Sequence, residues 1–159
     1  MTAPSDTDLL AILNETDTIA IVGASNNPVK PSLFVATYFH SRGKRIIPVN
    51  PVKAGETLLG ETILGDLSEI PKEIQVDMID IFRRSDHVPA IVDQAIELFV
   101  PGLKTIWMQY GVRHAEAADK ARQAGLKVVE DRCPKVEHMR LSGAPNPFGL
   151  RVGVSSKMR

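Results

Sequence analysis

Predominantly apolar runs alternate with amphipathic stretches along most of the chain. The apolar runs predict strands that are buried on both faces, at residues 18–22, 45–49, 76–82, 103–108 and 126–130. Between them, apolar residues recur at helical spacing over residues 7–14, from 31 or 32 to about 43, from 85 or 86 to 99, and 113–124. Such alternation is typical of right-handed βαβ crossovers and a parallel sheet.

These elements predict an α/β fold of Rossmann type, doubly wound, with a mainly parallel sheet of five or six strands and helices on both faces. Pro48 is an irregularity in the second strand, because proline lacks a ladder donor and prefers edges or strand ends. Residues 57–71 are expected to be irregular, with one short strand or turn. The chain from Arg132 onward has prolines and glycines but no periodicity, and residues 141–159 are expected to form an irregular tail.

The composition is that of one globular domain over residues 1–159, which begins with a lead-in helix within residues 1–16. Nineteen basic residues balance nineteen acidic ones, which argues against a general nucleic-acid or membrane-surface binder. No apolar run approaches the roughly 20 residues of a membrane span, and the acidic N-terminus does not resemble a signal peptide. Cys133 is the single cysteine and cannot form an internal disulfide, so a cytoplasmic location is expected.

Charge is distributed unevenly despite the zero net charge. Residues 18–55 contain no Asp or Glu but carry five basic residues: Lys30, Arg42, Lys44, Arg45 and Lys53. Solvated helix surface is one explanation. The other is that this half of the protein surrounds a small polyanionic ligand.

The turn after the first strand begins with Gly23, which lets the backbone approach a ligand, and the amides that follow can cradle phosphate oxygens. Only the first glycine of the dinucleotide fingerprint G-x-G-x-x-G is present. The second strand ends without the acidic residue that would hold ribose hydroxyls, and Lys53 follows instead. Both departures argue against a plain NAD site.

Four strand-ending segments together resemble a known family. They are Gly23–Ser25, Val49–Gly55, Ile79–Arg83 and Asp131–Pro134, and they are similar to loops of the small stand-alone CoA-binding proteins. That family is in turn similar to the N-terminal CoA-binding domain of the succinyl-CoA synthetase α-subunit. The resemblance covers roughly residues 15–140.

The resemblance implies that coenzyme A, or an acyl-CoA, lies across the C-terminal edge of the sheet. Its phosphates would lie near the first loop, at Gly23, Ala24, Ser25, Asn26, Asn27 and Lys30. The loop after the second strand would hold the nucleotide end, at Val49, Asn50, Pro51 and Lys53, and the third strand's end would line adenine and ribose, at Ile81, Phe82 and Arg83. The pantetheine arm would pass Gln109, Tyr110 and Gly111, and its thiol would end near Cys133. This sequence departs from the synthetase pattern at Ala54, where the pattern has glycine, and by lacking an acidic residue in residues 108–112.

We therefore expect a non-catalytic module that binds coenzyme A, alone, as a homo-oligomer or with a partner protein. An NAD(P)-binding oxidoreductase-like protein, one part of a multi-chain acyl-CoA ligase, and an interaction protein with a vestigial site are the alternatives. Ligase activity by the chain alone is not expected, because the synthetase's catalytic histidine belongs to a second domain. The histidines are widely dispersed and form no metal-ligand spacing, and no catalytic set is evident. Cys133 is either an inert half-buried thiol or a redox group, and Trp107 is expected in the core.

Overall fold

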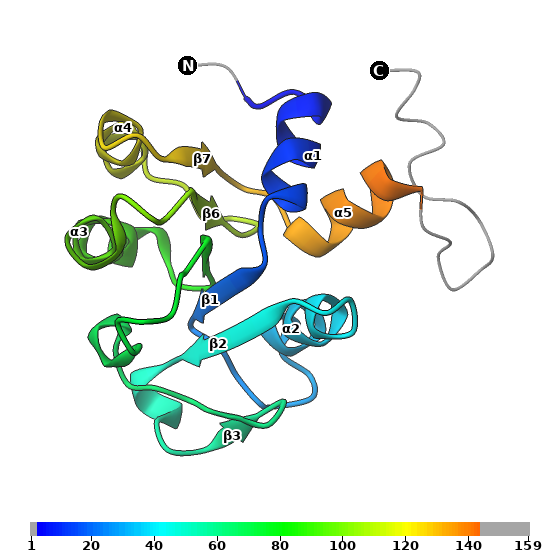
Figure 1. Cartoon of the computed structure of the whole chain (residues 1–159), viewed down its shortest axis with the longest axis vertical. Helices are drawn as coiled ribbons and strands as arrows, with labels where there is room; N and C mark the ends of the chain where they lie inside the picture. The colour runs from blue at the N-terminus through cyan, green and yellow to red at the C-terminus, as the bar shows by residue number, and fades with distance from the viewer. Residues whose placement is uncertain (1–2, 144–159) are drawn as a thin grey trace.

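The computed structural model describes residues 3–143. At its centre is a sheet of five parallel strands in the order β2-β1-β5-β6-β7 (Figure 1). This arrangement confirms the predicted doubly wound α/β fold. The strands span Thr18–Val22 (β1), Arg45–Val49 (β2), Met78–Ile81 (β5), Thr105–Met108 (β6) and Lys127–Val129 (β7).

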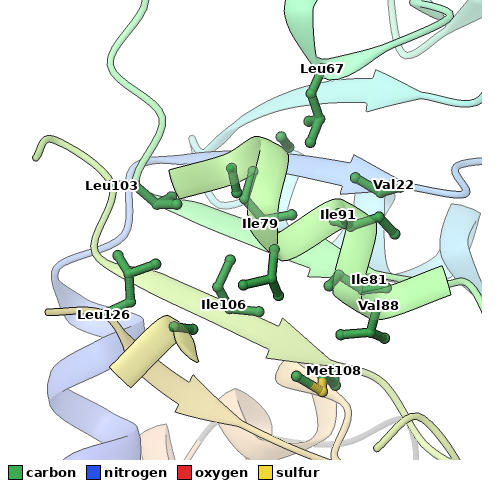
Figure 2. Packing of buried hydrophobic residues seen from close by; sticks show 14 of the residues in the cluster. Val22, Leu67, Ile79, Ile81, Val88, Ile91, Leu103, Ile106, Met108 and Leu126 are labelled. Carbon is green, nitrogen blue, oxygen red and sulfur yellow. The ribbon is translucent and has the colours of Figure 1, made fainter. Parts of the chain in front are cut away.

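Helices cover both faces of the sheet (Figure 1). One face carries α1 (Asp6–Asn14), α2 (Pro31–His40) and α5 (Pro134–Ser142), and the other carries α3 (Val88–Phe99) and α4 (Ala115–Gln123). Each face has its own apolar core, since alternate residues of a strand point to opposite sides. Figure 2 shows the core under α3, where Ile79 and Ile106 of the sheet lie below Val88 and Ile91 of the helix.

The position of β2 explains how the sheet accommodates Pro48. β2 is an edge strand, so the missing N–H of Pro48 costs little, while its carbonyl accepts a hydrogen bond from the N–H of Leu64 at 2.9 Å. Beyond β2, residues 57–71 hold more regular structure than the one short strand or turn expected: a short hairpin of β3 (Thr57–Leu58) and β4 (Glu61–Thr62), and a 3-10 turn at Leu67–Glu69. Two more 3-10 turns, Pro51–Lys53 and Ser85–His87, follow the ends of β2 and β5.

The expectation of an irregular chain from Arg132 is wrong for residues 134–142, which form α5. Pro134 occupies its first turn, and its last turn ends at Gly143 in the left-handed conformation. Ion pairs anchor the helix: Arg140 lies 2.8 Å from Asp6 of α1 and 2.7 Å from the buried Glu137. Because polar contacts hold much of α5 in place, apolar periodicity did not reveal it. Residues 144–159 of the expected tail lie outside the described residues.

The chain order creates a switch point at β1. The connection after β1 leads to β2 on one side, and the connection after β2 crosses to β5 on the other side. The loops that follow these three strands therefore meet at the carboxyl edge of the sheet, where ligands of such folds bind. No helix between residues 3 and 143 is both long enough and apolar enough to span a membrane.

Candidate ligand-binding site

A cleft of about 310 Å³ opens at this switch point. All three loops contribute to it, and the N-terminus of α2 forms one wall. Its lining consists of Gly23, Ser25, Lys30, Pro31, Ser32, Asn50, Val52, Lys53 and Phe82.

Gly23 joins the three strand ends. Its φ of +89° lies in the left-handed region, and a Cβ atom there would overlap the carbonyl oxygen of Phe82. The N–H groups of Gly23 and Ala24 both donate to the carbonyl of Val49, at 2.8 and 3.2 Å. The first two amides of the expected phosphate cradle are therefore already used to close the loop against β2.

Two buried serines provide donors in the cleft. The N–H of Ser25 donates to Ser32 Oγ at 3.0 Å, and the N–H of Asn27 donates to Ser25 Oγ at 3.1 Å. Since each hydroxyl accepts a backbone proton, its own proton is directed elsewhere and can reach a ligand. The N-cap residue of α2, Lys30, makes no side-chain cap, so the positive end of this ten-residue helix faces the cleft. The cleft thus has the donors that anions bind.

The folded chain pairs most cations of the acid-free stretch with acids from outside it. Lys44 lies 3.4 Å from Asp17, Arg45 lies 3.2 Å from Glu61, and Lys53 lies 3.9 Å from Glu56. The amide of Asn26 also donates to Glu56, at 3.0 Å. The uneven charge of the sequence is therefore largely balanced in space.

Two cations beside the cleft form no ion pair with an acidic residue of the described chain. Within residues 3–143, neither Lys30 nor Arg83 forms an ion pair. The Cδ atom of Arg83 lies close to Gly23, whereas Arg84 points to solvent and pairs with Asp86 at 3.3 Å. Lys30 and Arg83 are thus the cations best placed for an anionic ligand.

Several candidate residues of the second and third loops shape the carboxyl edge of the sheet. The amide of Asn50 donates to the carbonyl of Ala24 at 2.8 Å and its oxygen accepts from the N–H of Val52 at 3.0 Å, so it ties the first two loops together. Pro51 begins the 3-10 turn that carries Lys53. The side chains of Val49 and Ile81 are buried in the core under α3, so their main chains alone reach the edge.

The remaining candidates lie beyond β6 and β7. Tyr110 is exposed, and the N–H of Gly111 donates to Asp131 Oδ1 at 2.7 Å. Partial desolvation raises the pKa of Tyr110, and the nearby Cys133 and Glu137 raise it further. Trp107 is fully buried, as expected, and its indole N–H donates to the carbonyl of Arg132 at 2.8 Å. These hydrogen bonds hold the loops after β6 and β7 together.

Two polar side chains are buried beneath these loops. Cys133, the N-cap of α5, is 7% exposed and packs among the apolar residues of α1 and α2. Gln109 is 5% exposed, and in the orientation that satisfies both ends of its amide, the nitrogen donates to both carboxyl oxygens of Asp80 at 3.1 and 3.2 Å. Asp80 is fully buried, and desolvation raises its pKa well above the ordinary value.

Sequence reasoning missed Ser32, Glu56, Asp80 and Asp131 as residues that shape the edge. Ser32 and Asp80 had local signals, a polar residue at a helix start and a carboxylate within an apolar run. Glu56 had none, because its contact with Asn26 depends on how the loops after β1 and β2 meet. Asp131 adopts a φ of +57°, which the sequence does not indicate.

The fold defines a Rossmann-like α/β domain, with a cleft at the switch point of its sheet. Comparison with known proteins identifies the family within this class of α/β domains. The chain belongs to the CoA binding domain family, whose profile matches residues 17–139.

Relatives of similar length share this domain. Over 138 residues the chain is 33% identical to the uncharacterized protein YneT of Bacillus subtilis (strain 168), a match that covers 87% of this chain and 97% of YneT. The solved structure of cell-free ID.343 from Thermus thermophilus is 36% identical with a TM-score of 0.79, and the match covers 87% of this chain and 99% of that one.

A larger enzyme contains a similar region. The dinucleotide-forming acetyl-coenzyme A synthetase 1 of Ca. Korarchaeum cryptofilum is 25% identical to this chain, with a TM-score of 0.57. The similarity covers 70% of this chain and 25% of the synthetase chain.

Proposed function

We propose that this protein is a cytoplasmic, non-catalytic module that binds coenzyme A or an acyl-CoA at the carboxyl edge of its sheet. The observation that carries the proposal is the switch-point cleft, which is lined by serine hydroxyls, the start of α2 and Lys30, with Arg83 beside Gly23. Neither cation forms an ion pair within residues 3–143. Coenzyme A carries a pyrophosphate and a 3′-phosphate, and such a group of donors and cations suits phosphates.

In this proposal the pyrophosphate lies against Ser25, Ser32 and the first turn of α2. The nucleotide end then lies beside Lys53 and the Pro51–Lys53 turn, with the base toward Phe82 and Arg83. The pantetheine arm runs along the carboxyl edge past residues 109–111 toward Cys133. Its direction follows the sheet, because β6 and β7 lie beyond β5 on that side.

The surroundings of Cys133 support a binding rather than a catalytic role. A nucleophilic thiol needs a positioned base and access to substrate. Cys133 is buried, and His138 of the same helix is engaged with the hydroxyl of Tyr38, which lies 2.6 Å from its Nδ1. We interpret Cys133 as a packed thiol.

A ligand panel in a thermal-unfolding assay tests the proposal. Coenzyme A, acetyl-CoA, dephospho-CoA, NAD, NADP and ATP are compared at equal concentration. At 100 times its Kd, coenzyme A should stabilise the fold by about 2.7 kcal/mol. Tighter binding of NAD than of coenzyme A would overturn the proposal.

A matched pair of lysine variants locates the site. Lys30→Gln should weaken coenzyme A binding by about tenfold, because it removes a charge-assisted contact to phosphate. Lys72→Gln removes an equally exposed lysine from a loop away from the cleft and should leave the affinity unchanged. Equal effects of the two variants would indicate nonspecific attraction instead of a site.

A role as one part of a multi-chain acyl-CoA ligase is the second candidate. The observation that favours it is the similarity to a quarter of the acetyl-coenzyme A synthetase chain. A ligase part should co-purify with a second chain from its native source and release acetate from acetyl-CoA in the presence of ADP and phosphate. A lone chain without that activity would support the binding module.

A further inference from the structure

A second hollow, of about 500 Å³, opens at the same carboxyl edge beyond β6 and β7. Tyr110 and three arginines, Arg113, Arg122 and Arg132, line it. Three carboxylates, Glu130, Asp131 and Glu137, also contribute to the lining. We call this hollow the arginine cavity.

The carboxylates of the arginine cavity have partners within the protein. Asp131 accepts from the N–H of Gly111 and from Arg113, both at 2.7 Å. Glu130 accepts from the N–H of His114 at 3.1 Å, and one oxygen of Glu137 accepts from Arg140 at 2.7 Å and Arg132 at 3.3 Å. Each of the three carboxylates therefore already accepts at least one hydrogen bond from the protein.

The arginines keep most of their donors. A guanidinium has five N–H groups and stays charged at any physiological pH. Among the described residues, Arg113 donates to Asp131, Arg132 to Glu137 and Arg122 to Asp119. Arg122 also forms an ion pair with Glu130, at 3.9 Å. Several N–H groups of each arginine are left for water or a ligand. The cavity wall therefore favours a ligand that has hydrogen-bond acceptors.

The cavity lies within reach of a ligand bound at the cleft. In the strand order, β7 lies three positions from β1, which at the usual strand spacing amounts to roughly 14 Å. The pantetheine arm has a backbone equivalent to just over four residues, so its extended length is on the order of 15 Å. A coenzyme A with its pyrophosphate at α2 would bring its sulfur to the rim of the arginine cavity.

We propose that the arginine cavity receives the acyl group of a CoA thioester, and that this group is short and rich in hydrogen-bond acceptors, such as a hydroxyacyl or oxoacyl group. The inference rests on the proposed function, because it needs the phosphates of the same ligand in the cleft. A plain alkyl chain would displace water from the guanidinium groups without replacing its hydrogen bonds, which is unfavourable. A hydroxyl or carbonyl oxygen restores one of them.

Calorimetric titration with coenzyme A, butyryl-CoA and 3-hydroxybutyryl-CoA tests the inference, because the two thioesters differ by one oxygen. The wild-type protein should bind 3-hydroxybutyryl-CoA about tenfold more tightly than butyryl-CoA, as expected for one hydrogen bond to a charged group. Equal affinities, or tighter binding of butyryl-CoA, would overturn the inference while leaving coenzyme A binding intact. Absence of binding by all three ligands would overturn the proposed function as well.

Two arginine variants assign the preference to the cavity. Arg113→Gln should reduce the affinity ratio between the two thioesters to near one. Arg84→Gln should leave the ratio unchanged, since this side chain is 78% exposed, comparable to the 68% of Arg113, but pairs with Asp86 outside the cavity. Circular dichroism checks that both variants fold. A ratio that survives in Arg113→Gln would refute the placement of the acyl group.

Discussion

Single residues decide the shape of the cleft. Gly23 is the clearest case, because it combines a left-handed backbone with a contact to the main chain of Phe82, just after β5, that leaves no space for a side chain. Gly43 has a similar φ of +83°, but a Cβ atom added there would meet no atom within 4 Å. Comparing substitutions at the two glycines therefore distinguishes the cost of the unfavourable φ from the cost of steric overlap.

Gly23→Ala should destabilise the fold by on the order of 3 kcal/mol, and Gly43→Ala by about 1 kcal/mol. The first variant incurs both the unfavourable φ and the overlap with Phe82, whereas the second incurs the φ alone. Urea unfolding followed by circular dichroism measures both changes. Equal losses would mean that the loop after β1 can shift away from β5 at little cost.

Glu56 is an internal competitor for an anionic ligand. It lies 3.9 Å from Lys53 and accepts a hydrogen bond from Asn26, so it occupies two residues of the candidate site. Glu56→Gln should raise the affinity for coenzyme A by about threefold, a modest gain because the pair is partly exposed and screened by solvent. The matched control is Glu61→Gln, which loses the contact to Arg45 on the outer edge of β2. A similar gain in both variants would reflect overall charge rather than competition at the site.

At the scale of elements, β5 shows how context separates two carboxylates. Asp77, just before the strand, accepts from the N–H groups of Asp17 and Thr18, both at 3.0 Å, and pairs with Lys104 at 3.3 Å. Asp80, within the strand, is fully buried with the amide of Gln109 as its partner. The two carboxylates are three residues apart in sequence. Asp77 joins β1 to β5, whereas Asp80 lies where burial disfavours its charged form.

The raised pKa of Asp80 makes a prediction about pH. Burial favours the protonated form in the folded state, so the folded protein binds more protons than the unfolded chain above about pH 4. Stability contributed by this group is complete below that pH and is lost as the pH rises toward the raised pKa. Asp80→Asn removes the effect, so the free energy of unfolding of the variant relative to wild type should increase from pH 4 to pH 7.

Asp77→Asn is the matched control for Asp80→Asn. It weakens hydrogen bonds to two amides and one ammonium group, so the variant should be less stable than wild type at pH 7, by about 1–3 kcal/mol. Denaturant unfolding at several pH values measures both variants. If the free energy of unfolding of Asp80→Asn relative to wild type instead falls between pH 4 and pH 7, folding lowers the pKa of Asp80 and the prediction is wrong.

At the scale of the whole molecule, zero net charge coexists with a local excess of positive charge. Most surface cations pair with acids, whereas Lys30 and Arg83 remain free of them within residues 3–143. Long-range steering of an anion by net charge is therefore weak, and binding must depend on charges at the cleft.

Salt should accordingly weaken binding more than it weakens the fold. Raising sodium chloride from about 0.1 M to about 1 M shortens the screening length from about 10 Å to about 3 Å. We expect the affinity for coenzyme A to fall by at least tenfold, because several charged phosphates meet cations there. The unfolding midpoint should change little, since exposed ion pairs contribute little to stability. Calorimetry and thermal unfolding at both concentrations measure the two effects, and a salt-independent affinity would contradict phosphate recognition by Lys30 and Arg83.

The sequence by itself determined the strands and the edge at which their loops gather. Apolar runs bounded by turn residues predicted β1 and β2 with the bounds that the structure has, because strands buried on both faces need apolar residues throughout. Gly23, Asn50, Lys53 and Phe82 were identified as candidates for one site because each follows a strand of a parallel sheet, and they do line one cleft.

The tertiary structure alone decided which charges and donors are free. The partners of Lys44 and Arg45 come from segments well separated in sequence, and α5 is held by Arg140 reaching Asp6 near the other end of the described chain. The amides of Gly23 and Ala24, which local sequence marks as phosphate donors, are occupied by Val49. The physical reason is that apolar periodicity is a local property of one element, whereas an ion pair or a satisfied amide depends on which elements the fold brings side by side.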